Sequence, residues 1–219
     1  AYTNIAGAST LQYAVYVHFN QDNPAGAPWN STNEGPIPDD VYPNLLNSSS
    51  NPTGINMTVV GTAFNGVNPY GVNTGNNSGV YPDKVITQTW WLDANTTAML
   101  RIDGLSIAST YNFTFFASRA CTGCDRTTMY TIGTKSATLN AADNTNNTVV
   151  ISNVTADENG SVLLEIRAAG ASPFAYIGAM VIEAYVTSSG GENNSANSSN
   201  STTTMLGRVT NTNTSETNT

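Results

Sequence analysis

The chain is a series of short segments in which apolar and polar residues alternate. One side of the first segment carries five apolar residues when the chain is extended: Leu11, Tyr13, Val15, Val17 and Phe19. A period of two is typical of β-strands, and no stretch shows the spacing of an amphipathic helix. The sequence therefore predicts a protein built almost entirely of strands.

Proline, glycine and asparagine divide this pattern into about ten expected strands. The proline-rich stretch 22–40 and the Gly/Asn-rich stretch 65–83 are expected to be loops. Strands are expected at residues 11–20, 55–62, 84–93, 98–105, 111–118, 148–154, 161–168 and 174–186, with a hairpin over 128–140. Punctuated strands at this spacing indicate an antiparallel β-sandwich.

The second half of the body carries a recurring order of apolar motifs. A Gly-Leu turn at 104–105 precedes a Tyr-x-Phe-x-Phe strand at 111–115, then the hairpin, a strand with apolar residues at 162, 164 and 166, and a closing apolar strand. Over 98–185 this order resembles the malectin-like and galactose-binding-like jelly-roll modules of secreted proteins, and the loop 73–79 looks like loops in bacterial surface modules. The resemblance implies a jelly-roll sandwich and, because many members bind carbohydrate, a sugar-binding function. It transfers no sugar-contacting residue.

The last expected strand is apolar on both faces. One face carries Phe174, Tyr176, Met180, Ile182, Ala184 and Val186, and the other carries Ile177, Ala179, Val181 and Tyr185. Such a strand must be covered on both sides. Two interpretations stay open: a central strand beneath a loop of the same chain, or contact with another chain.

The composition restricts the partners. Seven Lys and Arg stand against 15 Asp and Glu in 219 residues, for a net charge of −8. Nucleic acids and anionic membrane surfaces need clustered cations, so neither is an expected partner. No run of about 20 apolar residues is present, so no membrane insertion is expected. Asn, Ser and Thr make up more than a third of the chain, and such a weakly charged polar surface favours a secreted, extracellular protein whose export signal has been removed.

Cys121 and Cys124 lie between two expected strands, in the sequence Arg-Ala-Cys-Thr-Gly-Cys-Asp-Arg. A zinc site needs about four ligands, which one cysteine pair and the single His18 cannot supply. We expect a disulfide that fixes a loop tip. A free dithiol and pairing with other chains are the alternatives.

Catalytic patterns are scarce, and we expect no enzyme and no cofactor. The chain has no Gly-x-Ser-x-Gly elbow, no His-Glu-x-x-His and no phosphate-binding glycine loop followed by Lys. The adjacent carboxylates at 39–40 and 157–158 are interpreted as turn residues. A structural calcium ion on loop Asp and Asn oxygens is an alternative that the sequence leaves open.

Four aromatic residues are candidates for stacking on a sugar ring: Trp29, Tyr70, Tyr81 and Trp91. Three lie in loop sequence, and Trp91 falls on the strand face opposite Trp90 and Leu92. The alternative is that loops pack over the outer face and bury these rings.

Glycosylation signals are dense. The pattern Asn-x-Ser/Thr occurs 13 times, against about seven expected from composition: at Asn30, Asn47, Asn56, Asn76, Asn95, Asn112, Asn146, Asn153, Asn159, Asn193, Asn197, Asn200 and Asn213. Glycan on some of these sites would suit a surface with few charges.

The composition changes after the body, which we place at 11–186. Residues 187–202 form a Ser/Asn/Gly-rich linker, and 203–219 form a Thr/Asn-rich tail with an expected strand at Thr203, Met205, Leu206, Gly207 and Val209. This appendage buries too little apolar surface to order itself. The linker reaches roughly 50 Å, farther than the roughly 40 Å width of the body. The tail can therefore add its strand to the open sheet edge of a neighbouring copy.

The leading hypothesis from the sequence is a secreted structural subunit that donates a terminal strand to the next copy. Such head-to-tail contacts propagate into an extracellular filament, a homopolymer, unless they close into a ring. The amino-terminal segment 1–10 is the second candidate for the donated strand. The alternative hypothesis is a carbohydrate-binding or adhesin module of a larger cell-surface protein, with the tail as a linker.

Overall fold

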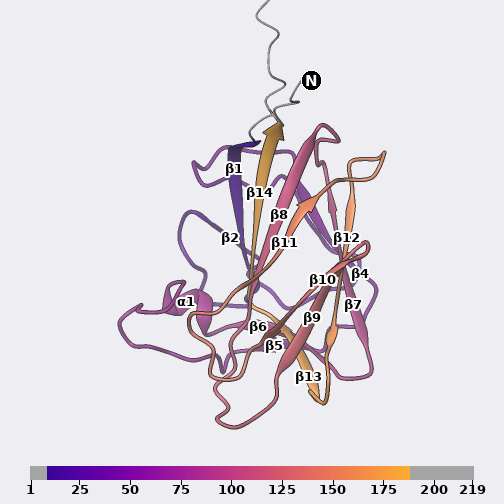
Figure 1. The fold of residues 1–219 in the computed structure, drawn as a ribbon. Helices are drawn as coiled ribbons and strands as arrows, with labels where there is room; N and C mark the ends of the chain where they lie inside the picture. The colour runs from indigo at the N-terminus through magenta and orange to yellow at the C-terminus, as the bar shows by residue number, and fades with distance from the viewer. Residues whose placement is uncertain (1–8, 188–219) are drawn as a thin grey trace, which may run out of the picture. The chain divides into compact units, whose positions relative to one another are not determined.

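Two β-sheets face each other across a shared apolar core in the computed structural model, which describes residues 9–187 (Figure 1). The five-stranded sheet has the order β11 (Val149–Val154), β8 (Ser109–Phe116), β14 (Ala179–Thr187), β1 (Ser9–His18), β2 (Trp29–Ser31). The six-stranded sheet has the order β10 (Lys135–Asn140), β9 (Thr127–Ile132), β12 (Val162–Ala168), β7 (Thr97–Asp103), β4 (Asn56–Val60), β3 (Val41–Tyr42). The predicted all-β sandwich is confirmed.

A smaller sheet of three strands lies at the lower end of the sandwich in Figure 1. Its order is β13 (Phe174–Ile177), β6 (Thr89–Asp93), β5 (Gly66–Asn68). All strand pairs within the described residues are antiparallel except β1 with β2.

The core consists of the inward faces that the alternation predicted. Tyr111, Phe113 and Phe115 on β8 are fully buried, as are Leu100 and Ile102 on β7. Across the sandwich the Phe115 ring stacks on Tyr130 with centroids 4.4 Å apart and an angle of 7° between the planes. At about 25 cal/mol per Å² of apolar surface removed from water, these rings supply much of the energy that closes the sandwich.

The last expected strand is two strands in two different sheets. β13 pairs with β6, whereas β14 pairs with β1 on one side and β8 on the other. The break falls at Gly178, where a Cβ would lie 3.0 Å from the Gln88 carbonyl oxygen. β14 is a central strand, and on its outer face Ala179 and Val181 are buried within the chain, whereas Glu183 and Tyr185 are partly exposed. The interpretation as a central strand is therefore the one that the described residues satisfy.

Three stretches expected to be loop or strand have a different local structure. Short strands β2 and β3 lie in or just after the stretch 22–40, and β5 lies in the stretch 65–83. Residues 84–86, expected to begin a strand, instead belong to the single-turn helix α1 (Asp83–Ile86). The Asp83 carboxylate explains the helical turn, since it accepts hydrogen bonds from the Thr74 and Asn77 backbone amides at 2.9 and 3.1 Å and ties the turn to the preceding loop.

The first strand also departs from strict alternation. A register shift between Leu11 and Tyr13 interrupts the pairing of β1 with β14. As a result Val15 and Val17 are buried as expected, whereas Leu11 is 48% exposed. A bulge changes which face each later side chain occupies.

The segments on which the strand-donation hypothesis rests lie outside the described residues. These are most of the segment 1–10, almost all of the linker 187–202 and the whole tail 203–219 with the expected strand from Thr203 to Val209.

Candidate functional site

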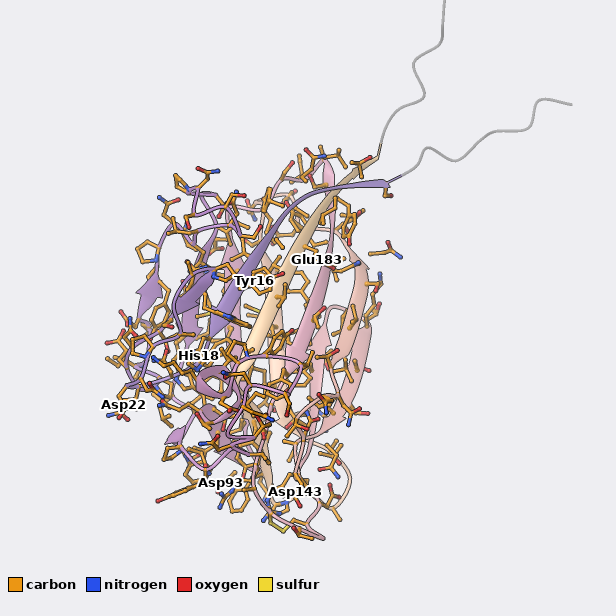
Figure 2. The ribbon with its side chains drawn as sticks, turned by 90° about the vertical axis from the view of Figure 1, so that its left-hand side faces the viewer. Tyr16, His18, Asp22, Asp93, Asp143 and Glu183 are labelled. Carbon is orange, nitrogen blue, oxygen red and sulfur yellow. A yellow bond between two sulfur atoms is a disulfide. The ribbon has the colours of Figure 1, made fainter. Side chains whose placement is uncertain are left out.

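The four aromatic candidates occupy two separate places. Trp29 packs edge-on against Tyr16 and Tyr81, with ring centroids 5.3 and 4.9 Å apart, and Tyr81 packs in turn on buried Phe116 at 5.4 Å. Burial raises the pKa of Tyr81 to about 12. These rings form a packed cluster on the outer face of the five-stranded sheet, along which Figure 2 shows Tyr16 and His18.

Trp91 instead lines a pocket on the three-stranded sheet. This pocket has a volume of about 160 Å³ and is lined by Asn68, Trp91, Arg119, Arg126, Phe174 and Tyr176; we call it the arginine–aromatic pocket. At about 30 Å³ per water molecule it holds about five waters, which is room for one ring-sized chemical group.

Strand register places the aromatic wall of this pocket. Trp91 on β6 lies directly opposite Tyr176 on β13 and opposite Gly66 on β5. Phe174, two residues before Tyr176, meets the Trp91 indole edge-on with centroids 5.5 Å apart. Gly66 has no side chain to cover the indole, and a Cβ there would lie 3.9 Å from Trp91 Nε1. The indole therefore remains half-buried, with part of its surface facing the pocket.

Two arginines form the polar wall. The Arg119 guanidinium lies over the Tyr70 ring, 5.2 Å from its centroid, and the Arg126 guanidinium lies over the Phe174 ring at 5.3 Å. Each makes one side-chain hydrogen bond to a neighbouring carbonyl: Arg119 Nη1 donates to Tyr70 at 3.1 Å, and Arg126 Nη1 donates to Asp125 at 2.7 Å. Arg126 Nε is buried without a hydrogen-bond partner.

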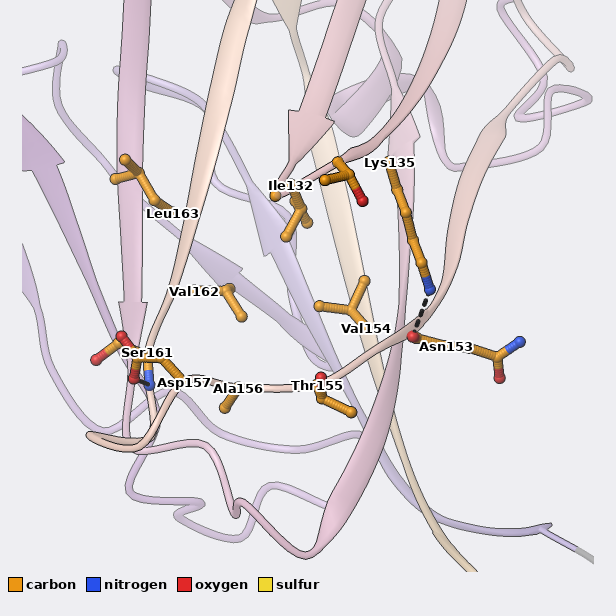
Figure 3. Close-up of a pocket in the computed structure, with 12 residues that line it drawn as sticks. Ile132, Lys135, Asn153, Val154, Thr155, Ala156, Asp157, Ser161, Val162 and Leu163 are labelled. Atoms are coloured by element: carbon orange, nitrogen blue, oxygen red, sulfur yellow. Dashed lines mark hydrogen bonds between the residues drawn. The ribbon is translucent and has the colours of Figure 1, made fainter.

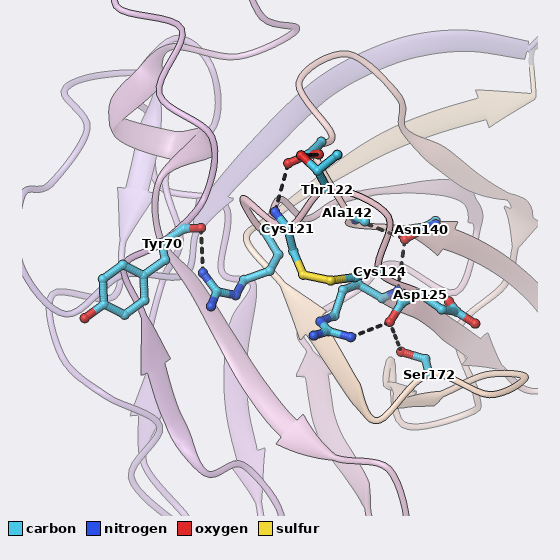
Figure 4. Close-up of a disulfide and its surroundings, with 11 residues drawn as sticks. Tyr70, Cys121, Thr122, Cys124, Asp125, Asn140, Ala142 and Ser172 are labelled. Atoms are coloured by element: carbon cyan, nitrogen blue, oxygen red, sulfur yellow. Dashed lines mark hydrogen bonds between the residues drawn. A yellow bond between two sulfur atoms is a disulfide. The ribbon is translucent and has the colours of Figure 1, made fainter.

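The disulfide loop positions both arginines. Cys121 and Cys124 are bonded, as the sequence predicted, and close a small loop between Arg119 and Arg126 (Figure 4). The loop runs from β8 in one sheet to β9 in the other, so its two ends are held by the sandwich itself. The bridge limits how far the backbone at Arg119 and the backbone at Arg126 can separate.

The nearby carboxylates accept hydrogen bonds from the loops around the pocket. Asp143 accepts from the Cys121 amide at 2.8 Å and from the Thr122 hydroxyl at 2.7 Å. Asp125 accepts from the Thr127 amide and hydroxyl at 2.9 and 2.7 Å. These hydrogen bonds hold the pKa of each carboxyl below its usual range, and the positive charge of Arg126 lowers the pKa of Asp125 further. Within residues 9–187 neither pocket arginine forms an ion pair.

The pKa of the Tyr176 hydroxyl reflects both its burial and the positive charges beside it. Burial raises the pKa of Tyr176, and the positive charges of Arg126 and Arg119 act against that rise. The buried Tyr130 hydroxyl fixes the strand from behind by donating to the Tyr176 carbonyl at 2.6 Å. The pocket thus combines an aromatic wall with two guanidinium groups that form no ion pair within the described residues.

Two larger depressions lack this chemistry. One, of about 500 Å³, opens between the ends of β9, β11 and β12 and is lined by aliphatic ends of the core such as Ile132, Val154 and Val162 (Figure 3). Its ammonium group, Lys135 Nζ, is already bound to the Ser152 and Asn153 carbonyls. The other, of about 510 Å³, follows the loop 60–65 and contains no cation.

The other titratable residues singled out in the sequence have structural positions. His18 is fully buried, and its burial lowers the imidazole pKa from 6.5 to about 4. The carboxylate of Asp157 accepts two turn amides, in keeping with a turn role. Residues 9–187 contain no group of three or more side chains suited to hold a metal ion. None of the helices in that part of the chain has the length and hydropathy to cross a bilayer.

The predicted glycosylation sites differ in how far the asparagine is already engaged. Asn30 Nδ2 donates to the Tyr16 and Leu46 carbonyls at 2.9 and 2.8 Å, so a glycan there would displace both bonds. Five sites are exposed: Asn76, Asn95, Asn146, Asn153 and Asn159. Four are partly buried: Asn30, Asn47, Asn56 and Asn112. Asn193, Asn197, Asn200 and Asn213 lie outside the described residues.

The sequence pointed to Trp91 and Tyr70 but not to the arginines beside them. Arg119 and Arg126 flank the cysteine pair and are two of only seven cations in the chain. That spacing was a usable signal, because a short disulfide loop brings its flanking residues together. Phe174 and Tyr176 were expected on one face of a single last strand. Tyr176 is indeed buried and Phe174 packs against the core, but their place in the wall of the pocket depends on the split at Gly178, which the sequence did not reveal.

Comparison with known proteins gives a fold-level likeness. No family model and no curated protein matches the chain. The chain is similar to part of a crystal structure of the plant peptide RALF23 in complex with FER and LLG2, at 13% identity and a TM-score of 0.45, over 59% of this chain and 41% of that one.

Two further structures, both from Arabidopsis thaliana, are comparable. The ANX2 ectodomain has 8% identity and a TM-score of 0.46, over 69% of this chain and 55% of that one. The ANXUR1 extracellular domain has 7% identity and a TM-score of 0.46, over 82% and 49%. The chain spans about half the length of the structures that it matches. With TM-scores below 0.5 the likeness does not establish a family, and the bacterial source suggested by the loop 73–79 stays a prediction.

Proposed function

We propose that the protein is an extracellular carbohydrate-binding module that holds a sugar ring in the arginine–aromatic pocket. The observation that carries the proposal is the pocket itself, in which the half-buried Trp91 indole faces uncommitted donors of Arg119 and Arg126. Pockets that recognise small ligands typically combine apolar walls with a few convergent polar groups.

The chemistry of the two walls suits a sugar. The C–H bonds on one face of a pyranose ring pack against the electron-rich face of an aromatic ring, and Trp91 supplies such a surface. Hydroxyl groups at the ring edge need donors and acceptors, which Asn68 and the two guanidinium groups supply. A volume of about 160 Å³ fits one unit of a longer saccharide.

The position of the pocket suits a tethered module. Ser9 and Thr187 are paired at the end of the sandwich opposite the three-stranded sheet (Figure 1). A disulfide and a surface with few charges suit an extracellular location. The module would present its pocket away from the point where the described chain ends.

The test is glycan binding by the purified full chain. We expect measurable affinity for at least one oligosaccharide on an array, followed by calorimetry. Trp91→Ala should weaken that affinity about tenfold or more, because truncating a central aromatic contact commonly costs at least 2 kcal/mol. Leu163→Ala, at an exposed position outside the pocket, is the matched control and should bind as the unaltered chain does.

Trp91→Phe separates binding from folding, since it keeps the packing against Phe174 while removing part of the stacking surface. It should bind with intermediate affinity. Absence of binding to every glycan, or equal affinity for the Trp91→Ala variant and the unaltered chain, would contradict the proposal.

Strand donation into a filament is the second candidate function, and one observation favours it. From Ser9 to Tyr13, β1 pairs with β14 alone among the described residues, so its other edge is open. An open edge is a template for an added strand. The donor strand from Thr203 to Val209 would supply the partner.

A further inference from the structure

We infer that the sugar held in the arginine–aromatic pocket carries a carboxylate, so that the ligand is an acidic saccharide. The inference rests on the proposed function and concerns which class of sugar the same pocket selects. Two of the seven cations of a chain with a net charge of −8 line one pocket of about 160 Å³.

The two guanidinium groups have donors to spare. A guanidinium has five N–H donors; Arg119 and Arg126 each donate to one backbone carbonyl, and both guanidinium groups also interact with the Tyr176 hydroxyl. A carbonyl satisfies a donor but does not neutralise a charge. Arg126 Nε is buried without a protein acceptor and lies out of reach of a ligand, so the donors that a ligand can use are those of the Nη groups. A bound anion would supply acceptors for these Nη donors and the missing negative charge.

The protein's own carboxylates fill that role only in part, since Asp125 interacts with the Arg126 charge without forming an ion pair with it. Asp125 and Asp143 each accept two hydrogen bonds from the disulfide loop or the start of β9. Both carboxylates therefore serve mainly to hold the backbone of the loop in place. The contrast with Arg101, which pairs with Asp103 at 2.9 Å, shows that this chain does neutralise an arginine elsewhere.

The guanidinium groups are also held in place before any ligand arrives. Arg119 lies over Tyr70 and Arg126 lies over Phe174, which restricts how each group can turn. The Cys121–Cys124 bridge limits the separation of the two residues. A planar carboxylate accepts two parallel N–H bonds from a guanidinium, so a fixed pair of arginines favours carboxylate over a neutral hydroxyl.

The net negative charge of the protein does not oppose this. At about 0.1 M salt, exposed charges more than about 10 Å away are largely screened, whereas charges inside a partly buried pocket are screened much less. The local pair of arginines therefore decides the selectivity. The Trp91 and Phe174 wall favours a ring over an extended acidic peptide, which would have no ring to place against it.

The test compares matched ligands on the full chain. Short oligomers of hexuronic acid are titrated by calorimetry beside the same oligomers with their carboxyl groups methyl-esterified. Two further ligands are compared: sulfated oligomers of an otherwise neutral sugar, of equal length, and an oligo-glutamate peptide. We expect the acid to bind at least about tenfold more tightly than its ester, since hydrogen bonds to charged groups are the stronger class.

Variants assign the effect to the arginines. Arg119→Gln and Arg126→Gln should each weaken binding of the acid about tenfold while leaving binding of the ester nearly unchanged. Arg126→Lys keeps the positive charge but loses the planar set of guanidinium donors. Its affinity for the acid should lie between that of the unaltered chain and that of Arg126→Gln. Arg101→Gln removes one positive charge outside the pocket and should leave both affinities unchanged.

The outcomes separate the two proposals. Equal binding of acid and ester, or tighter binding of the sulfated oligomer, would overturn the carboxylate inference while leaving sugar binding intact. Binding of the peptide with no glycan bound would overturn both. The supporting result is that the glutamine variants no longer bind the acid. Their circular dichroism should match that of the unaltered chain, which shows that they are folded.

Discussion

At the scale of single residues, the excess of asparagine has a structural use. Eight described non-glycine residues have positive φ, and five are asparagine: Asn23, Asn33, Asn44, Asn77 and Asn153. Asparagine tolerates the left-handed conformation better than most residues, and its side chain bonds to nearby backbone groups. Asn44 does both, since its Oδ1 also accepts from the Gly54 amide at 3.0 Å. The amides therefore fasten long loops without charged residues.

His18 gives the protein a predictable response to acid. The imidazole pKa is 6.5 in an unfolded chain and about 4 in the fold because burial disfavours the charged form. Between those values the unfolded state binds the proton more readily, so the free energy of unfolding falls as pH decreases. We expect a loss of about 2 kcal/mol between pH 7.5 and pH 5, measured by urea unfolding.

His18→Phe is the control for this response. Phenylalanine fills a similar space and does not titrate, and His18 Nε2 has no hydrogen-bond partner to lose. The contact with the Ser31 hydroxyl, at 3.4 Å, is long and contributes little. The variant should lose most of the pH dependence between 6.5 and 4. An unchanged slope would mean that a different group titrates in this window.

At the scale of elements, the disulfide loop is expected to control local order more than global stability. The bridge spans a sequence separation of only three, so its loss should cost no more than about 2 kcal/mol in unfolding free energy by the chain-entropy model. Its larger effect should be on the spacing of Arg119 and Arg126. Replacing both cysteines by serine should leave the sandwich folded and loosen the loop.

Hydrogen exchange measures that loosening directly. The Ala120 amide donates to the Tyr70 carbonyl at 2.8 Å, and the Cys121 amide donates to Asp143. Both amides should exchange faster in the double serine variant, while amides of β8 and β9 keep their rates. Unchanged exchange at these two amides would show that the loop holds its shape without the bridge.

The elements also show what alternation along the sequence can and cannot reveal. The faces of β7, β8 and β12 follow the period of two, because these strands lie across the core with one side buried. The split at Gly178 has no such signal, since residues on both sides are apolar and only the close approach of Gln88 and Thr89 requires the glycine. The register shift in β1 also leaves no sign in the alternation of apolar and polar residues.

Of the residues that line the arginine–aromatic pocket, only Trp91 was singled out from the sequence. Trp91 stood out because an aromatic residue on the polar face of a strand is unusual in an alternating pattern. Its neighbours come from β5, β13 and the loop between β8 and β9, which are far apart in sequence. Sequence spacing alone cannot bring these segments together, so the pocket became apparent only when the strands were paired.

At the scale of the whole molecule, the question is whether copies of the chain exchange strands. The open outer edges of the described sheets are short, six residues each for β10 and β11 and five for the first part of β1. An added strand would gain about six backbone hydrogen bonds at about 0.5–1.5 kcal/mol each. Burying Met205, Leu206 and Val209 would add about 1.5–3 kcal/mol apiece.

The cost of ordering offsets that gain. Fixing nine residues of tail costs about 1–2 kcal/mol each, or about 9–18 kcal/mol, against a total gain of about 8–18 kcal/mol. Association itself costs at least about 4 kcal/mol more. We therefore expect the full chain and a chain lacking residues 203–219 to elute as monomers at micromolar concentration in size-exclusion chromatography with light scattering, and to bind glycan equally. A larger species that is lost on truncation would show that the tail gains contacts beyond a strand ladder and three apolar side chains, and it would move filament assembly ahead of sugar binding as the function of the protein.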